Sequence, residues 1–240
     1  MQKTLLLALL ALIGSEVQAE GWTGKGELGL AVARGNSKSE TLNAKLGLSK
    51  DSERWKHDLG LQVLRVKGEV DDEFELTANR YEFTGSSAYK FNPRSYLIGA
   101  ARYEKDDFAP FEYQAILSLG YGYTAIEEEK THLSFEGGPG YRRAKDRTTG
   151  EIDGNAVARG KIDFRRQLTE TTELTNAFLV EAGSDNTFVQ NELGVSVKIN
   201  SSLALKTALQ TRHNTDVKPG IDKTDTLFTT NLVFGFLGNH

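Results

Sequence analysis

Apolar and polar residues alternate with a period of two along nearly the whole chain from Trp22 onward. In the segment 42–49, for example, Leu, Ala, Leu and Leu occupy the even positions, and Asn, Lys, Gly and Ser occupy the odd ones. Successive side chains of a β-strand point to opposite faces, so this pattern predicts strands with one apolar and one polar face. Twelve such segments follow one another. At about 18 residues for each strand and connection, they suit membrane-spanning strands with protruding ends.

The connections between these segments alternate in kind. Short polar turns are predicted at 50–53, 92–94, 127–130, 169–171 and 200–202. Connections that are mostly longer or more charged are predicted at 34–39, 66–73, 104–110, 145–153, 183–186 and 213–222, although 34–39 and 183–186 are short. The pattern predicts an all-β, antiparallel up-and-down transmembrane β-barrel of about 12 strands. With the amino terminus in the periplasm, the short turns would face the periplasm and the other set the outside.

Which face of the wall is apolar distinguishes two classes of barrel. A water-soluble barrel places its apolar face inside, whereas a membrane barrel turns that face toward lipid and its charged residues toward the lumen. We expect the membrane arrangement. The lumen-lining candidates are then Arg80, Glu82, Arg102, Glu136, Arg142, Arg159, Lys161, Asp163, Arg165, Glu192, Lys206 and Arg212.

Aromatic residues favour the membrane arrangement because they gather at the predicted strand ends. Membrane barrels carry two aromatic belts where the rings lie at the level of the lipid headgroups. The interfacial candidates are Trp22, Trp55, Tyr103, Tyr123, Tyr141 and Phe236, and we also assign Tyr96 and Phe188 to these belts by their position near strand ends.

The start of the chain has the pattern of a secretory signal peptide. Lys3 precedes an unbroken apolar run from Leu5 to Ile13, and Val17-Gln18-Ala19 supplies small residues at the two positions that a signal peptidase reads. We expect a signal peptide over 1–19 that is removed by cleavage, and a single β-barrel domain over 20–240.

Composition excludes several other classes. The chain has 240 residues, no cysteine and a net charge of -4. Without cysteine there is no disulfide scaffold, thiolate metal site or cysteine nucleophile. The mean hydropathy of -0.42 excludes a bundle of membrane helices. The acidic balance argues against nucleic acid as a partner.

Motifs that could carry chemistry are few. His132, Ser134 and Glu136 share one strand face. Residues two apart on a strand stand about 7 Å apart, too far for direct proton transfer, so we expect a hydrogen-bond ladder there. We expect no catalytic residue, cofactor or metal ligand set, and therefore no enzyme. The segment 137–140 (Gly-Gly-Pro-Gly) predicts a strand kink or bulge. The basic row within 159–165 would attract anions in an open pore, or pair with acidic residues of neighbouring strands in a plugged one.

An ordered set of motifs covers most of the barrel segment. It consists of 22–27 (WTGKGE), Gly35-Asn36-Ser37, Arg54-Trp55, 102–108 (RYEKDDF), 120–123 (GYGY), 133–143 (LSFEGGPGYRR) and 223–226 (KTDT). In this order the motifs resemble the salt-induced outer-membrane protein family, a domain-of-unknown-function group in Gram-negative bacteria. The resemblance implies an outer-membrane β-barrel, with no established substrate, cofactor or catalytic residues. Such barrels usually end on an aromatic residue, whereas here 237–240 follow Phe236.

These observations predict a monomeric protein of the cell outer membrane, exported through the secretory pathway. It would act as a narrow solute or ion passage or as an envelope-structural protein. A lipid-processing enzyme of the outer membrane and a soluble periplasmic ligand-binding barrel are the alternatives. The expected partners are outer-membrane lipids and lipopolysaccharide, with the barrel-assembly machinery and periplasmic chaperones during biogenesis.

Overall fold

The structure is a computed structural model that describes residues 21–33, 39–70, 73–217 and 222–236. In these residues the chain forms twelve strands. They are β1 (Trp22–Ala33), β2 (Ser39–Asp51), β3 (Trp55–Val70), β4 (Glu73–Asn92), β5 (Ser95–Asp106), β6 (Phe111–Glu128), β7 (Thr131–Asp146), β8 (Ile152–Gln167), β9 (Thr172–Gly183), β10 (Thr187–Lys198), β11 (Leu203–Asn214) and β12 (Thr224–Phe236). The predicted signal peptide, 1–19, lies outside the described residues.

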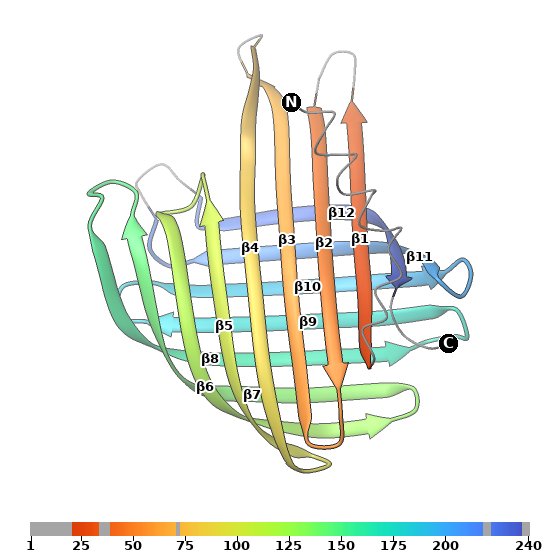
Figure 1. Cartoon of the computed structure of the whole chain (residues 1–240). Helices are drawn as coiled ribbons and strands as arrows, with labels where there is room; N and C mark the ends of the chain where they lie inside the picture. The colour runs from red at the N-terminus through yellow and green to blue at the C-terminus, as the bar shows by residue number, and fades with distance from the viewer. Residues whose placement is uncertain (1–20, 34–38, 71–72, 218–221, 237–240) are drawn as a thin grey trace.

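The strands close into one barrel. Each strand pairs antiparallel with its neighbours in sequence, and β12 returns to pair with β1 through Gly24–Phe236 to Leu28–Leu232. Figure 1 shows β1 to β6 running down the front wall, while β8 to β12 cross behind them. This confirms the predicted twelve-stranded, up-and-down antiparallel barrel. No described helix is long and apolar enough to cross a membrane.

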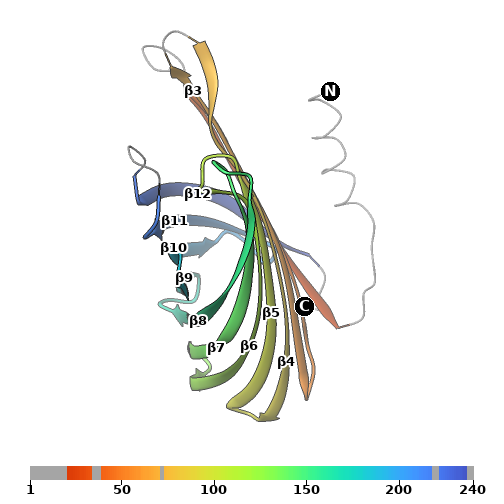
Figure 2. The same ribbon diagram turned by 90° about the vertical axis from the view of Figure 1, so that its left-hand side faces the viewer.

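The barrel has two different ends. One, which we call the turn end, carries the connections 52–54, 93–94, 129–130, 168–171 and 199–202. The other, which we call the loop end, carries the remaining connections. At the loop end the hairpin of β3 and β4 rises well beyond the other strands (Figure 2). This hairpin corrects one expectation, because most of the predicted connection 66–73 is strand. Backbone pairing between β3 and β4 continues as far as Val70 and Glu73, beyond the apolar band.

The wall of the barrel is apolar on the outside. Leu117 and Phe228 are 67% and 68% exposed, and many other large apolar side chains of the strands are exposed as well. On the opposite face Glu181 and Asn231 are each 1% exposed. A barrel stable in water would bury its large apolar residues. The observed inversion therefore contradicts the soluble binding barrel considered from the sequence.

The sequence predicts a strand kink or bulge at the Gly-Gly-Pro-Gly segment within 137–140, and the structure has no bulge there. The pairing of β6 and β7 keeps one register from Ser118–Gly140 to Tyr121–Gly137, and the register shifts of this pair lie elsewhere. A Cβ atom at Gly138 would stand 2.1 Å from the carbonyl oxygen of Leu119. Glycine is needed here because the two backbones approach too closely for any side chain.

Leu119→Arg tests the orientation of the wall. Leu119 is 62% exposed on the outward face of β6, midway between Tyr113 and Tyr123. Arginine there should lower the free energy of unfolding in lipid by about 2–4 kcal/mol, because the charge would face the middle of the bilayer. Thr148→Arg, in an exposed connection, is the control and should change it by less than about 0.5 kcal/mol. The measurement is a urea titration in lipid vesicles followed by tryptophan fluorescence. Equal stability of the two variants would contradict a lipid-facing wall.

Candidate functional site

The lumen carries the charged residues of the strands. Paired residues of an antiparallel ladder share a face, so the register places all twelve lumen-lining candidates on the inward face. Arg80, Arg102, Arg142, Lys206 and Arg212 are buried. Glu82, Glu136, Arg159 and Glu192 are nearly so, whereas Lys161 and Asp163 are about one-third exposed. Arg165 is 61% exposed at the turn end. The interior is therefore filled toward the loop end and wetter toward the turn end.

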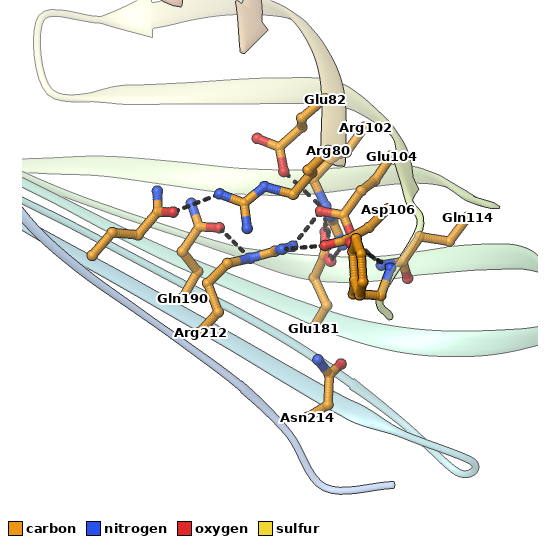
Figure 3. A network of polar contacts seen from close by, with 12 residues as sticks. Arg80, Glu82, Arg102, Glu104, Asp106, Gln114, Glu181, Gln190, Arg212 and Asn214 are labelled. Carbon is orange, nitrogen blue, oxygen red and sulfur yellow. Dashed lines mark hydrogen bonds and ion pairs between the residues drawn. The ribbon is translucent and has the colours of Figure 1, made fainter. Parts of the chain in front are cut away.

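Arg102 on β5 is the centre of the buried charge network (Figure 3). Its Nε donates a hydrogen bond to Oε2 of Glu181 on β9 at 3.1 Å, and its Nη2 forms an ion pair with the same carboxylate. Its Nη1 lies 3.1 Å from Glu104 and 3.5 Å from Glu82. One guanidinium thus connects carboxylates from three strands, which offsets the cost of burying each charge.

Arg212 on β11 ties opposite walls of the barrel together. It forms an ion pair with Glu104 on β5, and its Nη1 lies 3.3 Å from Oδ2 of Asp106 on the same strand. Its Nε donates to Oε1 of Gln190 at 3.1 Å. Since β5 and β11 are six strands apart in a closed barrel of twelve, this tie crosses the full width of the lumen. A second contact across the lumen joins β4 to β11, where Nη2 of Arg80 donates a hydrogen bond to Oε1 of Gln210 at 2.8 Å.

Phe188 lies inside this network and not in an interfacial belt. It is 1% exposed, and its ring centre lies 4.6 Å from Cζ of Arg102 and 4.8 Å from Cζ of Arg212. The ring attracts both guanidinium groups through cation–π contacts, and both groups also contact Oε2 of Glu104. The assignment from position near the strand end was wrong. Phe188 occupies an even-numbered position of β10, as the polar residues Gln190 and Glu192 do, and this shared parity places all three on the inward face. Strict use of that parity would have placed it correctly.

A second layer of ion pairs lies nearer the turn end. Nζ of Lys206 on β11 is 3.0 Å from Oε1 of Glu27 on β1 and 2.9 Å from Oε1 of Glu192 on β10. Glu192 also forms an ion pair with Lys45 on β2. Beside them, Nδ2 of Asn43 donates to Oδ1 of Asn231 at 3.3 Å. These contacts join β1, β2, β10, β11 and β12 across the lumen.

The turn half of the lumen keeps open space. A cavity of about 230 Å³ is lined by Lys25, Glu27, Lys45, Gln62, Glu82 and Thr84, among others. Another of about 320 Å³ includes Thr23, Lys25, Ser49 and Asp58. On the other wall, Glu136 accepts hydrogen bonds from Arg159 at 3.0 Å and from the hydroxyl of Tyr96 at 3.2 Å. Tyr96 therefore faces the lumen, which corrects its assignment to a belt.

The six interfacial candidates lie on the outward face. Trp22, Trp55, Tyr123 and Phe236 lie near the turn end, and Tyr103 and Tyr141 nearer the loop end. Trp55 contacts Tyr89 edge to face at 5.1 Å, and Tyr103 stacks with Tyr113 at 6.2 Å. Aromatic rings thus occupy both ends of the apolar wall.

The hydrogen-bond ladder expected at His132 is present, but its distances and its acidic member differ from the expectation. Nε2 of His132 lies 3.3 Å from Oγ of Ser134, and Nδ1 of His132 lies 2.6 Å from Oε2 of Glu127. The estimate of about 7 Å applies to the backbone positions, whereas the long imidazole side chain leans along the strand and closes the gap. The acidic member is Glu127 and not Glu136. The described residues contain no group of three or more histidine, aspartate or glutamate residues that could hold a metal ion.

Several residues of the network are not among the predicted lumen candidates. They are Glu104, Asp106, Gln114, Phe188, Glu181, Gln190 and Gln210. All except Phe188 are polar residues on the polar face of their strands. The alternation along each strand could therefore have predicted that they face the lumen. Which of them meet across the lumen depends on the curvature of the wall.

The barrel can now be compared with known proteins. Residues 26–236 match a family model described as "Protein of unknown function, DUF481". The chain belongs to the DUF481 family. A relative is the "Uncharacterized protein YdiY" of Escherichia coli (strain K12), which is 23% identical over 188 residues, or 78% of this chain and 72% of YdiY. The family match confirms the resemblance to a domain-of-unknown-function barrel family.

Solved structures share the fold of this DUF481 chain at low sequence identity. The NanC porin has a TM-score of 0.52 at 9% identity, covering 89% of this chain and 97% of the porin. The translocator domain of the autotransporter NalP from Neisseria meningitidis has a TM-score of 0.50 at 13% identity, covering 99% and 95%. An outer membrane channel from Pseudomonas putida F1 has a TM-score of 0.50 at 11% identity, covering 89% and 94%. The fold is therefore that of outer-membrane β-barrels.

Glu27 provides a test of the ion pairs in the lumen, because two lysines approach it in different surroundings. Lys206→Met removes a buried partner at 3.0 Å and should lower the free energy of unfolding by about 3–5 kcal/mol, since it leaves a buried carboxylate without its main partner. Lys25→Met, the matched control, removes a 52% exposed partner at 3.7 Å and should cost less than about 1 kcal/mol.

The double variant Lys206→Met/Glu27→Gln should recover much of the loss, because the uncompensated charge is gone. Urea unfolding in lipid vesicles measures all of these variants. Equal costs for the two lysine variants, or strictly additive costs in the double variant, would contradict a buried pair between Lys206 and Glu27.

Proposed function

We propose that this chain is a narrow passage for small ions and solutes in the outer membrane, constricted by the buried network around Arg102 and Arg212. The observation that carries the proposal is the tie from Arg212 on β11 to Glu104 and Asp106 on β5, which crosses the lumen. A passage of this kind admits small hydrated solutes only where side chains of the network leave room or move apart.

The location in the outer membrane is supported by the inverted wall and by the fold. Exposed Leu117, Leu119 and Phe228 need an apolar solvent, and a closed barrel leaves no unpaired strand edge in it. In this proposal the turn end faces the periplasm and the loop end faces outward, as in outer-membrane barrels with short periplasmic turns. Since the barrel closes on itself, a monomer suffices.

The shape of the lumen supports a constriction toward the loop end with a wetter vestibule at the turn end. Lys25 and Arg165 are more than half exposed in the turn half. Farther in, Arg102, Glu181 and Phe188 are buried together. Because arginines and carboxylates are paired in the constriction, the passage should show weak preference between anions and cations.

Conductance across a planar lipid bilayer tests the passage. The wild-type chain should give small, countable current steps, and Glu104→Ala/Arg212→Ala should raise the single-channel conductance severalfold. The double substitution removes the two side chains that meet in the middle of the lumen, and removing both charges together avoids leaving one of them unpaired.

The control is Glu112→Ala/Lys145→Ala. This pair has a separation of 2.7 Å but is only partly buried, near the loop-end rim of β6 and β7. Its removal should leave the conductance at the wild-type value. Current in neither the wild type nor the lumen variant would exclude the passage and favour an envelope-structural role. Equal gains in both double variants would show that the network is not the constriction.

Ester hydrolysis is a second candidate function, favoured by the chain of contacts Glu127–His132–Ser134. Serine, histidine and an acidic residue in this order resemble the arrangement that activates a nucleophile. Against it, Ser134 is 5% exposed, and neither lumen cavity described above reaches it. We therefore favour the passage.

Ser134→Ala separates the two functions. With a short-chain nitrophenyl ester as the probe, the wild type and Ser134→Ala should give the same background rate, because a buried hydroxyl has no access to substrate. Thr124→Ala, which alters a buried hydroxyl paired with Ser134 on the adjoining strand, is the control. A rate that falls only in Ser134→Ala would establish a hydrolase.

A further inference from the structure

The outward strand faces carry their charges only at the two ends of the barrel. At the loop end the basic residues are distributed unevenly around the rim. On β3, β5 and β7 the outward residues beyond the apolar band are Arg65, Lys67, Glu69, Lys105, Arg143 and Lys145, and we call the five basic ones the basic patch. In the described ranges, the outward faces of β8 to β12 carry no lysine or arginine in their loop-end halves. This side of the rim therefore carries an excess of basic residues over the acidic Glu40 and Glu69, which share its outward face.

Tyrosines and cations of the basic patch alternate along one rung of the sheet. The register pairs Tyr81 with Lys105, Lys105 with Tyr113, and Tyr113 with Lys145. From the spacing of strands, Lys105 and Lys145 stand about 10 Å apart across Tyr113, and Arg143 lies about 7 Å from Lys145 along β7. These cations lie on the loop side of Tyr103 and Tyr141, where a headgroup region would begin.

Two of these cations lack a direct carboxylate partner among the described residues, although Glu112 also attracts Lys105 at longer range. Lys145 pairs with Glu112 at 2.7 Å. Lys105 and Arg143 are exposed, and neither forms an ion pair or hydrogen bond with another residue of the described chain. The lumen cations Arg102, Arg142, Arg159, Lys206 and Arg212, by contrast, all have carboxylate partners. An anion from outside the chain would complete the basic patch.

We propose that the basic patch binds the phosphate groups of a phosphorylated glycolipid in the outer leaflet, an inference that rests on the membrane location in the proposed function. The ligand must be an amphiphile, because the patch continues directly into the exposed apolar wall at Leu117 and Leu119. Acyl chains lie along that wall while phosphates meet Lys105 and Arg143. Arginine contacts phosphate through two parallel hydrogen bonds, which makes Arg143 the stronger anchor.

Native mass spectrometry of the full chain, folded in detergent and titrated with bisphosphorylated lipid A, tests the proposal. Lys105→Gln/Arg143→Gln should weaken binding about thirtyfold, since each basic residue near a membrane surface contributes about 1 kcal/mol toward anionic lipid. The matched control is Lys130→Gln/Arg166→Gln, which removes two exposed cations at the turn end and should bind like the wild type. Lipid A without phosphates should bind weakly to every variant.

Glu112→Gln should change lipid binding in the opposite direction. It removes the carboxylate that occupies Lys145, so it should strengthen binding of bisphosphorylated lipid A, a result that damaged folding would not produce. Wild-type binding by Lys105→Gln/Arg143→Gln, equal binding of lipid A with and without phosphates, or no gain in Glu112→Gln would each overturn the proposal.

Two controls separate this inference from the proposed function. Heat-dependent mobility on gel electrophoresis verifies that every variant is folded before titration. A barrel that binds the lipid but carries no current would overturn the passage and leave the lipid site standing. A chain that leaves cell envelopes without detergent would overturn the membrane location and the lipid site with it.

Discussion

The closed ladder of backbone hydrogen bonds is the constraint on which the rest of the structure depends. Because β12 pairs with β1, every strand has a partner on both sides and the sheet has no edge. Only such a wall can turn apolar side chains outward into lipid, where an unpaired backbone group would cost several kcal/mol. Closure also sends the polar face of each strand into a shared, enclosed interior.

The enclosed interior explains why the lumen charges form a network. A buried charge is tolerated when a partner compensates for lost hydration, and the narrow barrel brings partners from opposite walls within reach. Arg102 and Arg212 meet carboxylates from β4, β5 and β9, and the ring of Phe188 contacts both guanidinium groups. The same contacts that stabilise the interior therefore also narrow it.

Basic residues are paired with carboxylates more completely inside the barrel than on its outer rim. Inside, Lys206 on β11 forms ion pairs with carboxylates on β1 and β10, and two cavities remain in the turn half. Outside, the basic patch has Glu112 as a carboxylate partner for Lys145, while Lys105 and Arg143 remain open. The lumen charges are thus mostly compensated by one another, whereas two cations of the loop-end rim have no ion pair with another described residue.

The sequence by itself determined the number of strands, their order and the face that each side chain occupies, because a period of two depends only on local backbone geometry. Parity would even have placed Phe188 in the lumen. It could not show that Arg212 meets Glu104, since that contact depends on which strands face each other once twelve are closed and tilted. Nor could backbone spacing show that His132 reaches Ser134, because side-chain direction decides it. Faces are local properties, whereas partners across a lumen are set only by the curvature of the whole wall.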